Sequence, residues 1–467
     1  MGFAEIVDIW RFFCLTKVLV QYTISTILIH KKRGGFFVSD QLTGLQSYEE
    51  FVPKLKKAVS DMPEEASIAI VYSDIKHFKY FNDTYGYRRG NKLLARMSEM
   101  FSSGGEGFLG GARVVSDNIV CARFCADGDE KVFLDEIKAS ISYIEQILRK
   151  EFSCERIRMT AGVFFIDAKA KGINVETAIS NANLARKQSK LDGNDSVTLF
   201  HPEMASKIDS ELEIISTIDE AINNHELEAY YQPKIESGTG RIIGAEALVR
   251  WIKPNGTMVY PDQFIPILEK SKQIINVDYY IYNEVFSFLR GRLDKGESVV
   301  PVSMNVSRQH MKDLEIIDYV RDLCDTYKVP PQYLEFELTE TMCTERTERV
   351  MEFITAFHEM GMKVSMDDFG SGYSSLKLLS QIPIDVIKLD RCFLRSRELG
   401  DREKIIITNI VHMTKELKMR SLCEGVETSD QSTFLAGIGC DEQQGYYYSK
   451  PVNIADFRQL LVSGCAR

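Results

Sequence analysis

The sequence of 467 residues lacks the cysteine and histidine patterns that form disulfide frameworks or zinc sites. Its 10 cysteines are scattered singly, with no C-x2-C pair, and its 7 histidines show no H-x3-H or H-E-x2-H spacing. Unpaired thiols in a chain of this length are typical of a reducing compartment. We therefore expect a cytoplasmic protein, and we expect any metal that it binds to have oxygen ligands.

Compositional bias is also absent. The chain contains 12 Pro and 30 Gly, is 44% hydrophobic and is 27% charged. These values exclude a disordered, collagen-like or fibrous protein. At about 150 residues per domain, the length predicts two or three globular domains.

A long uninterrupted hydrophobic run is missing as well. Residues 12–29 are mostly apolar, but Lys17 and Gln21 interrupt them and no small-residue cleavage site follows. One interpretation is a packing helix that ends at Gly34. The other is a membrane-associated helix, which would place the protein at the inner membrane. The sequence leaves both open, and we assign residues 1–34 to an N-terminal helix.

Excess basic charge is absent from the second half. Residues 1–200 carry 27 Lys and Arg against 25 Asp and Glu, whereas residues 201–467 carry 30 against 42. A protein that binds the backbone of a nucleic acid needs a basic surface, so an acidic half argues against DNA as a partner. Bound cations would be the exception, because they reverse the local field.

Helical and strand patterns divide the rest of the chain. Strand-like runs at 67–74 and 157–166, separated by helical stretches, predict an α/β or α+β domain over residues 35–200. The charged stretch 206–225 has neither Pro nor Gly, so we expect a helical linker, assigned to 201–216. Residues 217–467 then show repeated βα units, with strand-like runs at 228–234, 299–306, 334–338, 363–367, 386–390, 421–424 and 444–448.

Polar side chains mark the strand-like runs of this second series. In chain order they are Glu246, Asn305, Glu337, Asp367 with Asp368, Lys388, Glu424 and Gln444. All but one of the spacings between them lie between 20 and 36 residues, which is near one βα unit. In a (β/α)8 barrel the carboxyl ends of the strands meet at one face, so these groups would become neighbours.

Such a cluster of carboxylates needs protons or cations to persist. Oxygen ligands that include an amide favour Mg²⁺ or Mn²⁺. The adjacent Asp367 and Asp368 would let one carboxylate bridge two ions, and two ions are suited to in-line displacement at phosphorus. The sequence therefore predicts a two-metal site.

The second series contains seven further motifs, which are EALVRW at 246–251, NVS at 305–307, ELTE at 337–340, DDFGSGYSSL at 367–376, IKLD at 387–390, EGVET at 424–428 and QGYYYSKP at 444–451. By these motifs, residues from about 217 to 463 resemble the EAL domain of bacterial cyclic di-GMP phosphodiesterases. The resemblance implies a TIM-like (β/α)8 barrel that hydrolyses cyclic di-GMP to linear pGpG. The metal ligands that it implies are Glu246, Asn305, Glu337, Asp367 and Asp368.

The same resemblance implies roles for other residues. Lys388 would position the attacking water, Glu424 and Gln444 would complete the surroundings of the water and the second metal, and Glu340 would anchor the loop that starts at Asp367. Arg250 and Gln232 would contact the substrate. Glu427 is expected to be an outer or structural carboxylate.

The first half contains three motifs, which are DQLTGLQSYEEF at 40–51, SDIKHFKYFNDTYGYRRGNKLL at 73–94 and ISNANLARKQSKLDGN at 179–194. By these motifs, residues from about 36 to 200 resemble the GGDEF diguanylate cyclase domain, which implies a ferredoxin-like, cyclase-palm α+β fold. The signature itself is replaced by VSDNI at 115–119. Val115 cannot allow the close backbone approach to a phosphate that glycine allows.

Other positions of the implied nucleotide site are partly retained. Asp74, Asn82 and Asp117 remain, whereas Asn91 replaces an expected Asp and Asn118 an expected Glu. We expect a cyclase domain without activity that has a regulatory or structural role. GTP bound near Asn82 would be one regulatory input, transmitted through the helix at 206–225.

Two hypotheses for the whole chain follow. The first is a metal-dependent cyclic di-GMP phosphodiesterase that forms a homodimer, as barrels of this family often do. The second is a receptor that binds cyclic di-GMP without cleaving it and signals to a protein partner. Receptor versions usually lose metal ligands or the loop anchor, and the presence of all these residues here favours the enzyme. A bifunctional enzyme that also makes cyclic di-GMP is disfavoured by VSDNI.

Overall fold

The structure, a computed structural model, describes residues 40–103, 107–125, 130–167, 172–192, 196–370, 376–394 and 399–464. Its contacts divide the chain into two compact units, Met1–Lys207 and Ile208–Arg467. The helix predicted within residues 1–34 lies outside the described residues. Among the residues that are described, no helix has the length and apolar character needed to cross a membrane.

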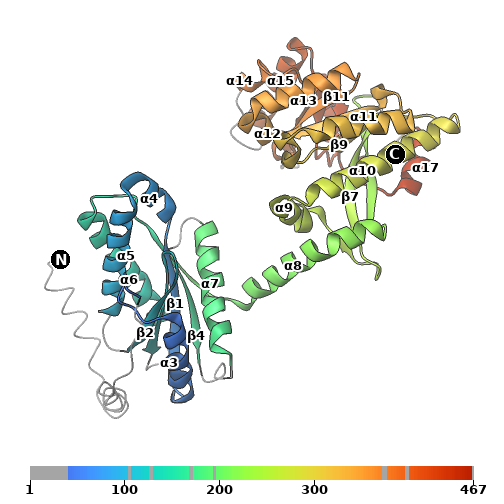
Figure 1. Ribbon diagram of the computed structural model, residues 1–467. Helices are drawn as coiled ribbons and strands as arrows, with labels where there is room; N and C mark the ends of the chain where they lie inside the picture. The colour runs from blue at the N-terminus through green and yellow to red at the C-terminus, as the bar shows by residue number, and fades with distance from the viewer. Residues whose placement is uncertain are drawn as a thin grey trace, which may run out of the picture. The chain divides into compact units, whose positions relative to one another are not determined.

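The first unit is a five-stranded sheet with helices on both faces (Figure 1). The strand order is β2-β3-β1-β4-β5, and every pair is antiparallel except β4 with β5. The strands are β1 (Ser67–Ile75), β2 (Phe108–Val115), β3 (Asn118–Cys125), β4 (Met159–Ile166) and β5 (Val197–Leu199). The helices are α3 (Tyr48–Ser60), α4 (Phe78–Tyr85), α5 (Tyr87–Ser102), α6 (Glu130–Glu151) and α7 (Val175–Asp192).

The central strand β1 explains this layering. All nine of its residues are buried. Because successive side chains point to opposite faces, Ile68 and Ile70 pack with α3 and α7, whereas Ala69 and Val71 pack with α4, α5 and α6. The strands predicted at 67–74 and 157–166 correspond to β1 and β4. The β2–β3 hairpin was not predicted, because Gly110 and Gly111 interrupt the apolar pattern of β2.

Helix α8 (Pro202–Asn223) covers the predicted linker, and the boundary between the two units falls inside it. Its carboxyl-terminal half buries Ile218 and Ala221 in a cluster that includes Trp251 and Phe264. This half of the helix is therefore part of the second unit.

The second unit contains a closed barrel of eight strands, in the order β6-β14-β13-β12-β11-β10-β9-β7 with β6 paired back to β7. The strands are β6 (Leu227–Glu236), β7 (Ile242–Ile252), β9 (Val302–Asn305), β10 (Leu334–Thr339), β11 (Lys363–Phe369), β12 (Val386–Leu389), β13 (Arg420–Cys423) and β14 (Glu442–Gln443), and β8 (Met258–Val259) extends the sheet beside β7. The TIM-like barrel predicted from the sequence is confirmed.

Helices surround this barrel (Figure 1). They are α9 (Pro261–Ser271), α10 (Ile274–Asp294), α11 (Glu315–Tyr327), α12 (Glu340–Glu345), α13 (Thr347–Glu359), α14 (Leu376–Leu379), α15 (Asp401–Glu416), α16 (Ser429–Gly437) and α17 (Ile454–Ser463), with short 3-10 helices at Arg308–Lys312, Pro331–Tyr333 and Arg391–Leu394. The main core lies between strands and helices and includes Phe286, Phe336 and Phe353.

The first strand of the barrel departs from a regular series of βα units. β6 is antiparallel to both of its neighbours, and a short turn joins it to β7. Antiparallel neighbours can be joined by a tight hairpin, whereas parallel strands need a long crossover. The hairpin places Gln232 of β6 directly opposite Glu246 of β7.

The strand predicted at 444–448 is wrong. β14 ends at Gln443, and the residues from Gly445 to Tyr448 form a turn in which Tyr448 N donates to Gly445 O at 3.1 Å. Gly445 lies so close to the backbone of Val426 that an added Cβ would be 2.2 Å from Val426 O. A side chain at position 445 would therefore collide with the backbone of Val426, and after this turn Val452 pairs with Tyr231 of β6.

Candidate active site

Lys388 lies at the centre of the candidate site. It belongs to β12, is completely buried and contacts four carboxylates from four different strands or strand ends. Its Nζ lies 2.5 Å from Glu337 Oε2, 2.8 Å from Glu424 Oε1, 2.9 Å from Asp367 Oδ1 and 3.5 Å from Glu246 Oε2. The structure thus brings together residues up to 178 positions apart in the sequence.

Three amides extend this cluster around Glu246. Gln444 Nε2 donates to Glu246 Oε2 at 2.7 Å and to Gln232 Oε1 at 3.0 Å, and Asn305 Nδ2 donates to Glu246 Oε1 at 3.2 Å. Gln444 Oε1 is buried and has no hydrogen-bond partner among the described residues. The site therefore contains an acceptor oxygen to which none of the described residues donates.

A bulge in β11 positions the adjacent carboxylates of Asp367 and Asp368. The pairing of β11 with β12 shifts register between Met366 and Phe369, and Asp368 has a φ of 58°. Successive side chains of a regular strand would point to opposite faces, and a bulge with a left-handed residue changes that alternation. Both aspartates consequently interact electrostatically with Lys388.

Burial and like charge raise the pKa of most of these carboxylates. Burial, followed by repulsion from Glu337, raises the pKa of Glu246, and burial also raises that of Asp367 although Lys388 opposes it. Burial raises the pKa of Glu424 to about 8. One ammonium group therefore does not balance the carboxylates gathered around it.

Glu337 and Lys388 are shifted in the opposite sense. Burial acts against the charged form of Glu337, but Lys388 and Lys234 outweigh burial and lower its pKa to about 2. Burial also acts against the charge of Lys388, and the surrounding carboxylates outweigh it and raise its pKa well above the usual value. These two groups form the ionised centre of the cluster.

The residues chosen as metal ligands fit a hard divalent cation by their chemistry. They supply carboxylate and amide oxygens only, which Mg²⁺ and Mn²⁺ favour. Among the described residues, no three His, Cys, Asp or Glu side chains form a group that could hold a metal ion as they stand. In this arrangement one oxygen of each of four carboxylates lies within 3.5 Å of Lys388 Nζ.

Two further predicted residues lie beside this cluster. Glu340, the first residue of α12, accepts a hydrogen bond from Gly370 N at 3.1 Å through Oε2. The half-buried Arg250 lies on β7 four residues beyond Glu246, with its guanidinium 5.7 Å from the ring centre of Tyr230, and burial lowers its pKa. Glu427 is exposed.

Sequence reasoning missed a second buried lysine in the barrel. Lys234 Nζ lies 2.9 Å from Glu335 Oε1 and 3.1 Å from Glu337 Oε1. One feature of the sequence could have indicated a buried cation here. Glu335 and Glu337 are two residues apart on one strand, so their acidic side chains lie on the same face of β10.

The residues predicted for a nucleotide site in the first unit are largely engaged with the protein. The carboxylate of Asp74 accepts hydrogen bonds from Thr160 and Arg186, and from Lys190 Nζ at 3.0 Å. Asp117, in the β2–β3 turn, accepts from Ile75 N at 3.1 Å.

The two asparagines of this set lie on neighbouring helices. Asn82 is on α4, and its Oδ1 is buried without a hydrogen-bond partner among the described residues. It lies against Gly90, where an added Cβ would be 1.8 Å away. Asn91 is an exposed residue of α5.

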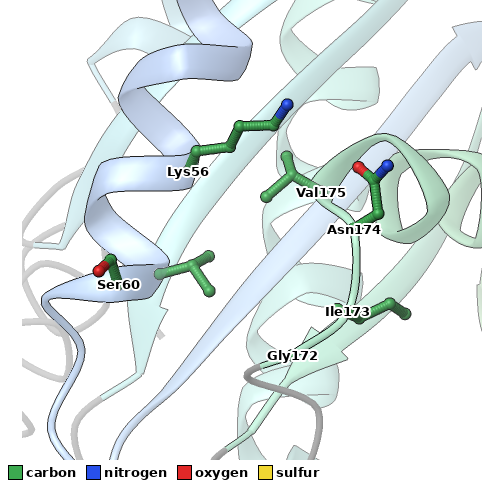
Figure 2. A pocket seen from close by; sticks show the side chains of 7 residues that line it. Lys56, Ser60, Gly172, Ile173, Asn174 and Val175 are labelled. Carbon is green, nitrogen blue, oxygen red and sulfur yellow. The ribbon is translucent and has the colours of Figure 1, made fainter.

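A hollow on the first unit, shown in Figure 2, is not lined by a cluster of carboxylates like the one around Lys388. It lies between the end of α3 and the start of α7 and is lined by Lys56, Val59, Ser60, Gly172, Ile173, Asn174 and Val175. Lys56 is the charged member of this lining, and its Nζ pairs with Glu176 at 2.7 Å. We therefore do not regard the hollow as a reaction site.

Comparison with known proteins extends these observations. Curated relatives include the cyclic di-GMP phosphodiesterase NbdA of Pseudomonas aeruginosa, 30% identical over 90% of this chain and 54% of its own length. The bifunctional diguanylate cyclase/cyclic di-GMP phosphodiesterase MucR of the same organism is 27% identical over 91% and 61%. The chain thus spans about half to three fifths of the length of these relatives.

Among solved structures, a complex of the MucR phosphodiesterase with cyclic di-GMP has a TM-score of 0.50 and 29% identity. It covers 52% of this chain and 99% of that one. The family model described as the diguanylate cyclase GGDEF domain matches residues 37–196, and the model described as the EAL domain matches residues 215–451, which is half of the chain. The chain therefore belongs to the EAL domain family, with a GGDEF domain preceding the EAL domain.

Proposed function

We propose that the EAL domain hydrolyses one phosphodiester bond of cyclic di-GMP to give linear pGpG, in a reaction that requires Mg²⁺ or Mn²⁺. The observation that carries this proposal is that four carboxylates surround Lys388. Their combined negative charge, when they are ionised, exceeds the single positive charge of that ammonium group. Cations would complete the balance, and they would also allow a dianionic substrate to approach an acidic site. The activities named for the relatives NbdA and MucR agree with this proposal.

The residues proposed to hold the cations are Glu246, Asn305, Glu337, Asp367 and Asp368. Two such ions, when bound, activate a water molecule and neutralise charge on the phosphate. Lys388 holds Glu337, Asp367 and Glu424 in place and orients the attacking water. Gln444 Oε1, to which no described residue donates, is available to accept a hydrogen bond from that water or from the substrate.

The remaining predicted residues position the substrate and the loop. Arg250 presents a half-buried positive charge to a substrate phosphate, on the same face of β7 as Glu246. Gln232 is held by Gln444 and by Ser449 O, which its Nε2 contacts at 3.1 Å. Glu340 fixes the start of the loop through Gly370 N.

The test is incubation of the purified protein with cyclic di-GMP in Mg²⁺, in Mn²⁺ or in EDTA, with the products separated by chromatography. We expect pGpG in either metal and none in EDTA. Binding of cyclic di-GMP without cleavage in any metal would contradict the proposal. That result would favour the receptor hypothesis, in which the domain signals to a protein partner.

We further propose that the GGDEF domain does not synthesise cyclic di-GMP. Val115, where a glycine would allow close approach of a phosphate, is 62% exposed at the hairpin, and Asn118 Nδ2 donates to Val115 O at 3.0 Å. The carboxylate of Asp74 is already paired with Arg186 and Lys190. Both carboxylates of the predicted site, those of Asp74 and Asp117, therefore already accept hydrogen bonds from the protein.

Restoring the GGDEF signature is not expected to restore synthesis of cyclic di-GMP. The triple variant Val115→Gly/Ser116→Gly/Asn118→Glu restores the signature glycines and acid, but Asn91 and the pairing of Asp74 are unchanged. Incubation with GTP and Mg²⁺ should give no cyclic di-GMP in either the original or the triple variant. The phosphodiesterase should be blocked in this assay by Glu246→Gln so that any product accumulates. Synthesis by the original protein would contradict our interpretation of residues 115–119.

A further inference from the structure

Lys234 is a buried charged group to which the proposed reaction assigns no role. It lies on β6 and is 3% exposed. Burying a charged lysine without a partner costs free energy of folding. Lys234 does have partners, because two carboxylates of β10 lie within 3.1 Å of its Nζ. Burial acts against its charge, but Glu335 and Glu337 outweigh burial and raise its pKa.

The side chain of Lys234 crosses the interior of the barrel. Strands β6 and β10 are not neighbours, because β7 and β9 lie between them on the shorter path around the barrel. The contact with β10 therefore does not follow from strand pairing. It arises from side chains that project into the barrel from nearly opposite walls.

Glu337 is held at both of its oxygens by this arrangement. Oε1 contacts Lys234 at 3.1 Å, whereas Oε2 contacts Lys388 at 2.5 Å. A carboxylate bonded to one lysine could rotate about its last bond. A carboxylate bonded to two lysines from different strands, one at each oxygen, has its plane defined.

We infer that Lys234 is a positioning residue for the metal site, which fixes the Glu337 carboxylate so that Oε2 faces the side of Lys388, Asp367 and Glu246. This inference rests on the proposed function, because it takes Glu337 as a metal ligand. Some residues do not touch the metal but hydrogen-bond to one of its ligands and orient it. Removing such a residue typically lowers the affinity for the metal by about 10- to 100-fold.

The alternative role for Lys234 is to neutralise Glu335 alone. Glu335 is buried, lies two residues before Glu337 and contacts the same ammonium group at 2.9 Å. A lysine with that structural role would be dispensable once Glu335 had lost its charge. The double variant Lys234→Met/Glu335→Gln removes both members of this pair and leaves Glu337 with Lys388, so it distinguishes the two roles. It also removes the unpaired buried carboxylate that would destabilise the single variant.

The experiment measures Mn²⁺ binding to the full chain by electron paramagnetic resonance and calorimetry, together with turnover of cyclic di-GMP as a function of Mn²⁺ concentration. Lys234→Met and the double variant should each bind Mn²⁺ about 10- to 100-fold more weakly. Their turnover should recover at high Mn²⁺, with an unchanged KM for cyclic di-GMP. Glu335→Gln, the matched control, should bind Mn²⁺ as the original protein does.

Two results would overturn the inference. One is the original Mn²⁺ affinity in Lys234→Met, and the other is its restoration in the double variant, which would make Lys234 a counter-ion for Glu335 only. Circular dichroism and thermal melting establish that each variant is folded. Because Mn²⁺ binding is measured directly, a chain that binds the metal but cleaves no cyclic di-GMP would refute the proposed function and leave the role of Lys234 measurable.

Discussion

Replacing Glu246 with glutamine is expected to remove detectable pGpG formation. Glu246 accepts hydrogen bonds from Gln444 and Asn305 and lies 3.5 Å from Lys388, so it connects three parts of the site. A glutamine keeps its size but removes the charge and one acceptor oxygen. Loss of a direct ligand should exceed the roughly 10- to 100-fold effect of losing an outer partner, because both water activation and charge neutralisation depend on it. Product chromatography over a range of Mn²⁺ concentrations measures this effect.

The matched control for this variant is Glu442→Gln. Glu442 is also a buried carboxylate of the barrel, 5% exposed, but its ion-pair partner is Arg420, at 3.0 Å, and not Lys388. It should keep most of its turnover. Asp367→Asn should behave like Glu246→Gln, since Asp367 lies 2.9 Å from Lys388. Full turnover in either proposed ligand variant would mean that the metals are held elsewhere.

Replacing Lys388 with methionine is expected to abolish turnover and to destabilise the barrel in EDTA. Four carboxylates share this one buried ammonium group, and breaking a buried ion pair by removing one partner typically costs about 3–5 kcal/mol. Mn²⁺ should recover part of this free energy of unfolding, because a cation that binds only the native state stabilises it. Turnover should not return, since the group that orients the water is lost.

Urea unfolding with and without Mn²⁺ measures this effect. Trp251 is buried in the second unit and reports on the barrel by fluorescence, provided that Trp10, which is the other tryptophan, is changed to phenylalanine. Lys328→Met is the matched control, because Lys328 and its partner Asp325 are both exposed, and it should unfold almost as the original protein does. An equal loss of stability with and without Mn²⁺ would show that no cation takes the place of Lys388.

The strand-end groups of the site could be predicted from the sequence alone, because in a barrel of parallel strands they meet at one face. The carboxylates of Glu337, Asp367 and Glu424 indeed all lie within 2.9 Å of Lys388 Nζ. The partners that cross the barrel could not be predicted in this way. Lys234 is one lysine among 57 basic residues, and nothing in its own strand indicates that it reaches β10.

The pairing of Asp74 with Arg186 and Lys190 was equally hidden. These residues are 112 and 116 positions away from Asp74. They belong to the motif at 179–194, which does not by itself indicate which of its side chains face the sheet. The prediction retained Asp74 as a nucleotide-site residue. The structure shows its carboxylate bonded within the protein.

The amino-acid sequence by itself determined the family, the barrel and the chemical nature of the site, because these depend on local motifs and on the spacing of strands along the chain. Only the tertiary structure decided that β6 runs antiparallel to its neighbours, that a bulge brings Asp367 and Asp368 to the same cluster, and that two lysines hold Glu337. The first two features depend on how neighbouring strands pair, and the third depends on which walls of the closed barrel face each other. That relation is fixed by the closure of the sheet and leaves no mark in the sequence of any single strand.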